Sequence, residues 1–289
     1  EHLTVNQRVL GSSPRGGAKD KAITKVVAFF VWFFYLATSK FKFISMTFLF
    51  RFIYFIKRKI RALFVLRKIH FIGDSHTEVF WNMEFSPLYF WRLTPKIKVV
   101  HGATATGLAN PNSKTQALGI FENYLKEEVK KDDYVVFQLG EVDCGFAIWY
   151  RAEKHGLSIQ KQTQLAIDNY SNLIQKSSAI NGKKTIVCSA VLPTIQEGSN
   201  FGEVANLRKE VKANIKERTQ LTLDFNRMLR QLAEKNHLGF MDLDQSLLNE
   251  KTSIIHSKFL HKDSTNHHLD PSSLAKIISK ELNIIISKF

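Results

Sequence analysis

Four residues with chemically useful side chains stand together where an apolar run ends, in the stretch Gly73-Asp74-Ser75-His76. A serine hydroxyl becomes a good nucleophile only when a neighbouring base removes its proton. On a turn between a strand and a helix, the hydroxyl of Ser75 would be exposed and its backbone N–H could stabilise a developing oxyanion. The other interpretation is that Asp74 or Ser75 simply caps the following helix. Spacing alone leaves both open.

A base for such a nucleophile is available near the C-terminus. His267 and His268 precede a segment that Asp270 can cap and Pro271 can begin as a helix. An acidic side chain could hold either imidazole in the required tautomer, and Asp263 is the nearest upstream candidate. The alternative is that the two histidines belong to an ordinary solvated loop.

The elements that must position these residues follow from apolar runs that each end in a turn signal. Continuous Val, Ile and Phe content is typical of strands buried on both faces of a parallel sheet. Helical patterns lie between these runs, and the third of them changes phase near residues 219–221, which predicts a break. The predicted strands are 68–73, 96–102, 133–140, 184–191 and 238–243, and the predicted helices are 120–131, 160–178, 203–235 and a last one starting at Asp270.

This alternation of strands and helices predicts an α/β fold, a three-layer α/β/α sandwich around a five-stranded parallel sheet of the flavodoxin-like type. In such a sheet, ligands bind beyond the carboxyl ends of the strands. Polar or glycine-containing clusters follow the first three strands, at 73–76, at Gly102 and at 140–143. We therefore expect these clusters to meet at one edge of the sheet.

These motifs, taken in order, resemble the SGNH (GDSL-like) hydrolase superfamily over about residues 67–289. The resemblance implies that Ser75 is the nucleophile and that His268 is the base. His267 stays open as an alternative base, and Asp263 would be the orienting acid. The implied oxyanion hole consists of the amides of Ser75 and Gly102, with Gly140, and Gly107 is a weaker candidate for the second donor. Residues expected around the substrate are Asp74, His76, Glu141 and Asp143.

The chain departs from the family pattern in two places. Val142 stands where the family has an asparagine whose side chain supplies a third oxyanion donor. Three residues before His268 the chain has Thr265 instead of aspartate, and Ser264 takes that place for His267. Because loss of one oxyanion donor costs about 100- to 1000-fold in rate, slow catalysis or no catalysis stays open.

The function expected from this pattern is serine-dependent ester hydrolysis, as an esterase or O-acetyl hydrolase. The substrate would be a small-molecule or glycan ester, such as a bacterial surface polysaccharide, because the stretch Gly-Glu-Val-Asp-Cys resembles a variant found in proteins of such loci. No cofactor and no metal are implied. Three alternatives stay open: an acetyltransferase with the same triad, an inactive glycan-binding protein, and a metallophosphoesterase with two metals. The metal ligands in the last case would be His70, Asp74, His76, Asp143, His267 and His268.

The charge of the chain is concentrated at its N-terminal end. The net charge is +15, and residues 1–66 hold 12 Lys and Arg against 2 Asp and Glu. We expect this part to be a basic aromatic extension, of which residues 1–45 need not be natural protein, followed by the hydrolase domain at 67–289. Basic and aromatic residues together favour an anionic membrane surface for residues 23–61 over nucleic acid. The two cysteines, Cys144 and Cys188, are expected to be buried thiols of a cytoplasmic protein that is free or membrane-associated.

Overall fold

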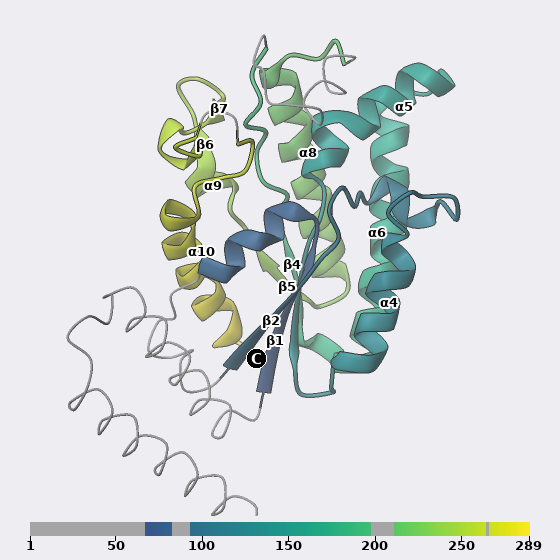
Figure 1. Ribbon diagram of the computed structural model, residues 1–289, viewed down its shortest axis with the longest axis vertical. Helices are drawn as coiled ribbons and strands as arrows, with labels where there is room; N and C mark the ends of the chain where they lie inside the picture. Colours follow the sequence, from purple (N-terminus) through teal and green to yellow (C-terminus); the bar gives the residue numbers. More distant parts are fainter. Residues whose placement is uncertain (1–66, 83–92, 198–210, 264–265) are drawn as a thin grey trace, which may run out of the picture. The chain divides into compact units, whose positions relative to one another are not determined.

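The computed structural model describes residues 67–82, 93–197, 211–263 and 266–289 (Figure 1). The predicted N-terminal extension and its membrane contact lie outside the described residues. So do Ser264 and Thr265, where the chain departs from the family pattern. Within the described ranges, none of the helices combines the length and the apolar character that crossing a membrane requires.

A five-stranded parallel sheet forms the centre of the described structure, in the order β2-β1-β3-β4-β5. The predicted fold class is therefore confirmed. Four strands lie where the apolar runs predicted them, but β2 covers residues 93–99, so Gly102 lies beyond it in a loop. The strands are β1 (Arg67–Gly73), β2 (Leu93–Val99), β3 (Tyr134–Gln138), β4 (Thr185–Cys188) and β5 (Gly239–Met241), and a separate hairpin consists of β6 (Leu248–Asn249) and β7 (Ile254–Ile255).

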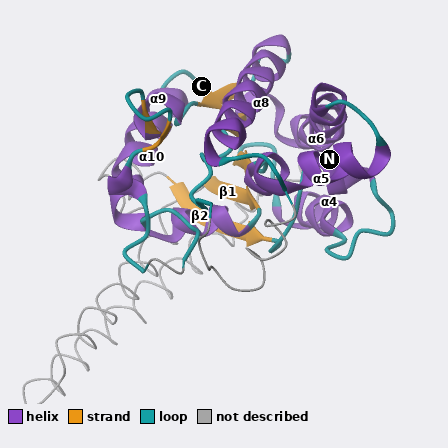
Figure 2. Ribbon diagram, turned by 90° about the horizontal axis from the view of Figure 1, so that it is seen from above, coloured by secondary structure: helices purple, strands orange, loops and turns teal. Residues whose placement is uncertain are grey.

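Helices cover both faces of this sheet. In Figure 2 the strands lie between α9 and α10 on one side and α4, α5 and α6 on the other. The helices are α4 (Ala117–Glu128), α5 (Ile148–His155), α6 (Ile159–Asn181), α8 (Ile215–Lys235), α9 (Asp244–Leu247) and α10 (Pro271–Ile286). Shorter 3₁₀ or π segments are η1 (Ser75–Asn82), η2 (Thr106–Ala109), η3 (Asp143–Ala147), η4 (Gly182–Lys184) and η5 (Ser257–Phe259).

Two hydrophobic cores result from the alternation of side chains along each strand. In β3, Val135 and Phe137 join the core that contains α4, α6 and α8, whereas Tyr134 and Val136 join the core beneath η1 and α10. Both faces of the strand are buried, which explains why its sequence is a continuous apolar run rather than an alternating one.

The last helix forms as its sequence predicts. The carboxylate of Asp270 accepts a hydrogen bond from the backbone N–H of Ser273 (2.8 Å), and Pro271 is the first helical residue. Its predicted stripe faces the second core, where Leu274, Ile278, Leu282 and Ile285 are buried. The loop that carries the two histidines is therefore held at the start of a well-anchored helix.

The break predicted near residues 219–221 is wrong, because α8 runs continuously from Ile215 to Lys235. Thr219 and Thr222 are fully buried there although they are polar. Their hydroxyls donate to the carbonyl oxygens of Ile215 and Arg218, four residues earlier, so each threonine is satisfied within the helix. The two threonines interrupt the apolar pattern of the sequence, but the helix continues through them.

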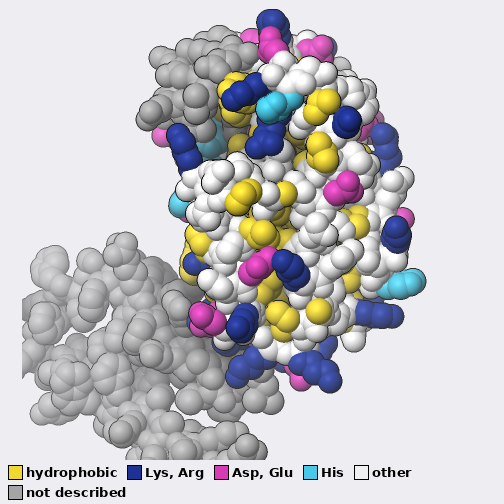
Figure 3. All heavy atoms as spheres, turned by 90° about the vertical axis from the view of Figure 1, so that its right-hand side faces the viewer, with side chains coloured by type: hydrophobic (Ala, Val, Ile, Leu, Met, Phe, Trp, Pro, Cys, Tyr) yellow, Lys and Arg dark blue, Asp and Glu magenta, His cyan; other side chains and the backbone are white. Residues whose placement is uncertain are grey.

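The two cysteines are free thiols and both are buried, as predicted. On the face that Figure 3 shows, Lys and Arg side chains are interspersed with Asp and Glu. One ion pair, between Lys176 and Glu122, joins α6 to α4.

Candidate active site

Ser75 begins η1 directly after β1, on the predicted turn from strand to helix. The backbone oxygen of Asp74 accepts from the N–H of Thr77 (3.1 Å), and its side chain accepts from the N–H of His76 (2.9 Å). Asp74 therefore caps the segment, which leaves the half-buried Ser75 available for chemistry. The capping interpretation is thus confirmed for Asp74, and the role of Ser75 as nucleophile stays a prediction.

Gly73 is required by a close approach of neighbouring chains. It pairs with Gln138 of β3. A Cβ atom at position 73 would lie 2.0 Å from the backbone oxygen of Gln138 and 2.3 Å from Oγ1 of Thr77. The backbone turn is not what demands glycine here, because Gly73 is not among the residues with a positive φ.

Asn266 orients His268, a contact that the sequence did not predict. Its side-chain oxygen accepts from the backbone N–H of His268 (2.9 Å) and lies 2.8 Å from Nδ1 of the same residue. Because the backbone N–H can only donate, the atom facing both groups is the oxygen, and Nδ1 must carry a proton. The lone pair of the neutral imidazole is therefore on Nε2.

The Nε2 atom of His268 is buried and has no hydrogen-bond partner among the described residues. The pKa of His268 is lowered to about 3, mainly because the side chain is buried and also because the imidazoles of His76 and His267 are close to it. At neutral pH this imidazole is uncharged, which is the form in which a general base acts.

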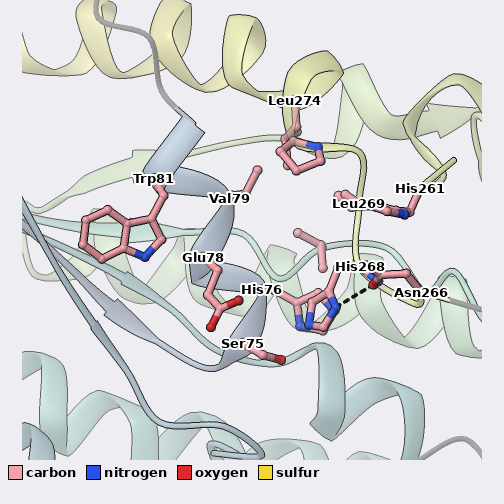
Figure 4. Close-up of a pocket in the computed structure, with 12 residues that line it drawn as sticks. Ser75, His76, Glu78, Val79, Trp81, His261, Asn266, His268, Leu269 and Leu274 are labelled. Atoms are coloured by element: carbon pink, nitrogen blue, oxygen red, sulfur yellow. Dashed lines mark hydrogen bonds between the residues drawn. The ribbon is translucent and has the colours of Figure 1, made fainter. Parts of the chain in front are cut away.

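Ser75 and His268 line the same cavity, which has a volume of about 240 Å³ (Figure 4). No hydrogen bond connects Nε2 of His268 with Ser75 in the described structure, but such bonds are often long before substrate binds. The other lining residues are His76, Glu78, Val79, Trp81, Val191, His261, Asn266, Leu269, Pro271 and Leu274.

His76 is buried between two carboxylates and two imidazoles. Its Nδ1 lies 3.3 Å from Oδ1 of Asp74, and its Nε2 lies 3.8 Å from Oε2 of Glu141. The ring centre of His76 is 4.8 Å from that of His268 and 5.8 Å from that of His267. Of the predicted substrate-binding residues, His76 lines the cavity, whereas Asp74, Glu141 and Asp143 are not among its lining residues.

Asp143 holds the loop that follows β2. It is fully buried, and its carboxylate accepts from the backbone N–H groups of Ala105 (2.7 Å) and Thr106 (2.8 Å) and from the hydroxyl of Thr106. Burial raises the pKa of this carboxyl, and the three donors oppose that shift. With both oxygens engaged inside the protein, Asp143 is placed to position the loop rather than to contact a substrate.

Gly102 and Gly140 differ in what they do. Gly102 is exposed, with φ of +69°, in the loop next to η1, where His101 approaches Glu78 across the gap (3.4 Å). Gly140 is buried with φ of +126°, and a Cβ there would lie 2.6 Å from the Phe225 ring. The contact with Phe225 and the positive φ are sufficient to explain why position 140 is glycine. Gly102 is not among the residues that line the cavity of Ser75, and its role in an oxyanion hole stays a prediction.

The remaining predicted residues occupy the loop before α10. Asp263 accepts from the N–H of Asn266 through its backbone oxygen (3.0 Å), while its own N–H donates to Nδ1 of His261 (3.1 Å). The group against Nδ1 of His268 is Asn266, so the orienting position expected for Asp263 is filled by an amide. An asparagine two residues before a histidine is a signal for such a turn, because asparagine often bonds the backbone two residues on.

The six residues of the predicted two-metal set are not brought together. His70 lies inside β1, where its Nδ1 is 2.9 Å from the hydroxyl of Tyr124 and its Nε2 is 3.3 Å from Asp133. At about 3.3 Å per residue, it is about 10 Å from the end of the strand. Asp143 is engaged with its loop, as described above. Only the histidines at positions 76, 267 and 268 gather, with Asp74 next to them.

Several solved structures are similar to this chain. A GDSL-like lipase from Bacteroides thetaiotaomicron has a TM-score of 0.47 and 15% identity, covering 76% of this chain and 88% of the lipase. An acetyl-xylooligosaccharide esterase from Geobacillus has a TM-score of 0.45 and 14% identity, over 76% and 93% of the two chains. An extracellular lipase from Streptomyces rimosus has a TM-score of 0.44 and 12% identity, over 76% and 99%. No protein-family model matches the chain, and comparison with curated proteins finds no match.

Proposed function

We propose that this protein is a serine-dependent ester hydrolase of the SGNH type. One observation carries the proposal: Ser75 and an uncharged His268 with an available Nε2 line the same cavity. The similarities to solved structures, at these identities and TM-scores, say nothing about which residues act, so the proposal rests on the geometry of the site itself.

In the proposed reaction, Nε2 of His268 takes the proton of the Ser75 hydroxyl as Oγ attacks the acyl carbon. The backbone N–H groups of Ser75 and Gly102 donate to the oxygen that becomes negatively charged. The protonated imidazole then gives its proton to the leaving alcohol as the ester C–O bond breaks. Water repeats the sequence on the acyl-enzyme, releasing the acid and restoring Ser75.

Asn266 replaces the usual carboxylate without imposing the wrong tautomer. In a Ser-His-Asp protease, asparagine in the orienting position lowers kcat about 10⁴-fold because the imidazole adopts the other tautomer. Here the amide oxygen faces Nδ1, which keeps the lone pair on Nε2. An uncharged partner still stabilises the imidazolium less than a carboxylate does, so we expect a slow enzyme.

The cavity suits a short acyl group next to a flat substrate. Its volume of about 240 Å³ is smaller than that of most drug-sized ligand sites. Trp81 lines it with 58% of its surface exposed, so the indole presents a flat face to an incoming group. An acetylated sugar fits both features, because a sugar ring can stack on the indole while the acetyl group enters the cavity.

A non-catalytic glycan-binding protein is the second candidate. It is favoured by the uncharged Asn266 and by a His268 whose low pKa makes it a weak proton acceptor. Such a protein would bind an acetylated sugar in the same cavity without cleaving it.

A fluorophosphonate probe separates the two candidates. We expect the full chain to be labelled, and Ser75→Ala to lose the label. Ser257→Ala is the matched control, since Ser257 is exposed and remote from the cavity lining, and it should label like the wild type. Labelling that persists in Ser75→Ala, or a wild type that neither labels nor hydrolyses p-nitrophenyl acetate, would refute the enzyme assignment.

A further inference from the structure

Three imidazoles from two separate segments of the chain lie together, and two of them, His76 and His268, line the cavity. His76 comes from η1, and His267 and His268 come from the loop before α10. One ligand nitrogen from each residue lies within 4.8 Å of the others. The serine mechanism needs one imidazole, so it does not explain why three are gathered in a partly buried place.

Hydrogen-bond acceptors on the outer side of the cluster orient two of the rings. Oδ1 of Asp74 lies 3.3 Å from Nδ1 of His76, and Oδ1 of Asn266 lies 2.8 Å from Nδ1 of His268. Metal-bound histidines usually have such an oxygen partner on the other ring nitrogen, which fixes the tautomer and aims the free nitrogen at the metal. In this orientation Nε2 of each ring is the nitrogen that a metal ion would bind.

The spacing of the rings matches one shared ion. Three imidazoles bound tetrahedrally to Zn²⁺ at about 2.0 Å have ring centres about 5 Å apart. The observed distances between ring centres are 4.2 Å for His267 and His268, 4.8 Å for His76 and His268, and 5.8 Å for His76 and His267. Small side-chain rotations would place the three nitrogens about 2.0 Å from one shared ion.

The donor set selects a class of ion. Imidazole nitrogens suit Zn²⁺ and similar divalent transition metals, whereas Mg²⁺ and Ca²⁺ require mostly oxygen ligands. Glu141 has a carboxylate oxygen 3.8 Å from Nε2 of His76, so an oxygen ligand or a water can complete the fourth position.

We propose that His76, His267 and His268 bind a single Zn²⁺-class ion, and that the bound ion switches off the chemistry of Ser75. The claim that the ion switches off Ser75 rests on the proposed function, whereas the claim of metal binding does not. Nε2 of His268 has one lone pair, which cannot hold a metal and accept the proton of Ser75 at the same time. Metal binding and ester hydrolysis are therefore mutually exclusive states of one site.

Metal binding is tested with the full chain, free of any tag and treated with a chelator. Calorimetric titration with Zn²⁺ should give one site per chain, and X-ray absorption of the loaded protein should show three nitrogen ligands at about 2.0 Å. His267→Gln should weaken binding at least tenfold. His101→Gln is the matched control, because His101 is 73% exposed and outside the cluster, and its affinity should not change. Absence of wild-type binding, or equal losses in both variants, would overturn the site.

Ser75→Ala distinguishes failure of this proposal from failure of the proposed function. This variant keeps all three histidines, so it should bind Zn²⁺ like the wild type although it hydrolyses nothing. In the wild type, hydrolysis of p-nitrophenyl acetate should fall in proportion to Zn²⁺ occupancy and return when chelator is added. Full activity in the fully loaded protein would overturn the switch while leaving the metal site standing. If His267→Gln does not fold, Asn266→Ala replaces it and should also weaken binding.

Discussion

Replacing Gly73 by alanine tests whether β1 and β3 pack as closely at this position as the structure shows. The added Cβ would lie 2.0 Å from the backbone oxygen of Gln138, whereas an ordinary contact begins near 3.4 Å. The oxygen belongs to the strand paired with Gly73, so relief requires that the two strands separate by more than about 1 Å. Overpacking usually costs about 1–3 kcal/mol, and a clash with backbone lies at the upper end, so we expect a loss of about 3 kcal/mol.

The assay for Gly73→Ala is unfolding in urea, with thermal unfolding as a second measurement. For a domain of this size, a loss of about 3 kcal/mol lowers Tm by about 6–12 °C. Gly119→Ala is the matched control: Gly119 lies in α4, and a Cβ there meets nothing within 4 Å. That variant should gain about 0.5–1 kcal/mol from helix propensity. A Gly73→Ala protein within about 0.5 kcal/mol of the wild type would refute the packing argument.

Three further substitutions test other contacts. Asp143→Asn should cost about 1–3 kcal/mol in urea unfolding, because Ala105 and Thr106 donate to different oxygens of Asp143 and one of these becomes an NH2 group that cannot accept; unchanged stability would contradict its positioning role. Asn266→Ala should lower kcat about 10- to 100-fold with little change in KM, and Asn266→Asp should restore it; equal loss in both would exclude an orienting role. Burial, with the nearby Asp242 as a second cause, raises the pKa of Asp244 from 3.8 to about 7. The folded state thus prefers the protonated acid, and the wild type loses stability as pH rises from about 4 through 7. The free energy of unfolding of Asp244→Asn should therefore exceed that of the wild type by about 2–4 kcal/mol at pH 8 and equal it at pH 4. A difference that does not change with pH would contradict this reasoning.

Much of the fold could be predicted from the sequence, because local and global signals agree. The run around Val135 and Phe137 is apolar throughout, and burial on both faces requires that pattern. Asp270 and Pro271 mark the start of α10 through capping chemistry that operates within one turn. The error at Thr219 has the opposite cause: a hydroxyl that bonds its own helix is buried at little cost, so polarity did not indicate exposure there.

The site was less predictable, because its contacts join residues far apart in the sequence. The position of Ser75 followed from the turn after β1, but the role of Asn266 depends on which loop atom faces Nδ1 of His268. Asp143 was expected near the substrate, and its side chain instead turns inward to the loop at residues 105–106. The approach of His76 to the two later histidines has no signature in residue spacing, since it results from the packing of η1 near α10.

The placement of Ser75 at the beginning of the described structure and His268 near its end has a consequence for biosynthesis. About 190 residues separate them, and α10, which anchors the histidine loop, is synthesised after both. A nascent chain therefore carries its hydroxyl long before the imidazole can reach it. If Ser75 and His268 act together as proposed, Ser75 stays inert until residues 266–286 have been synthesised and folded, and a chain truncated shortly before residue 266 should not react with a fluorophosphonate.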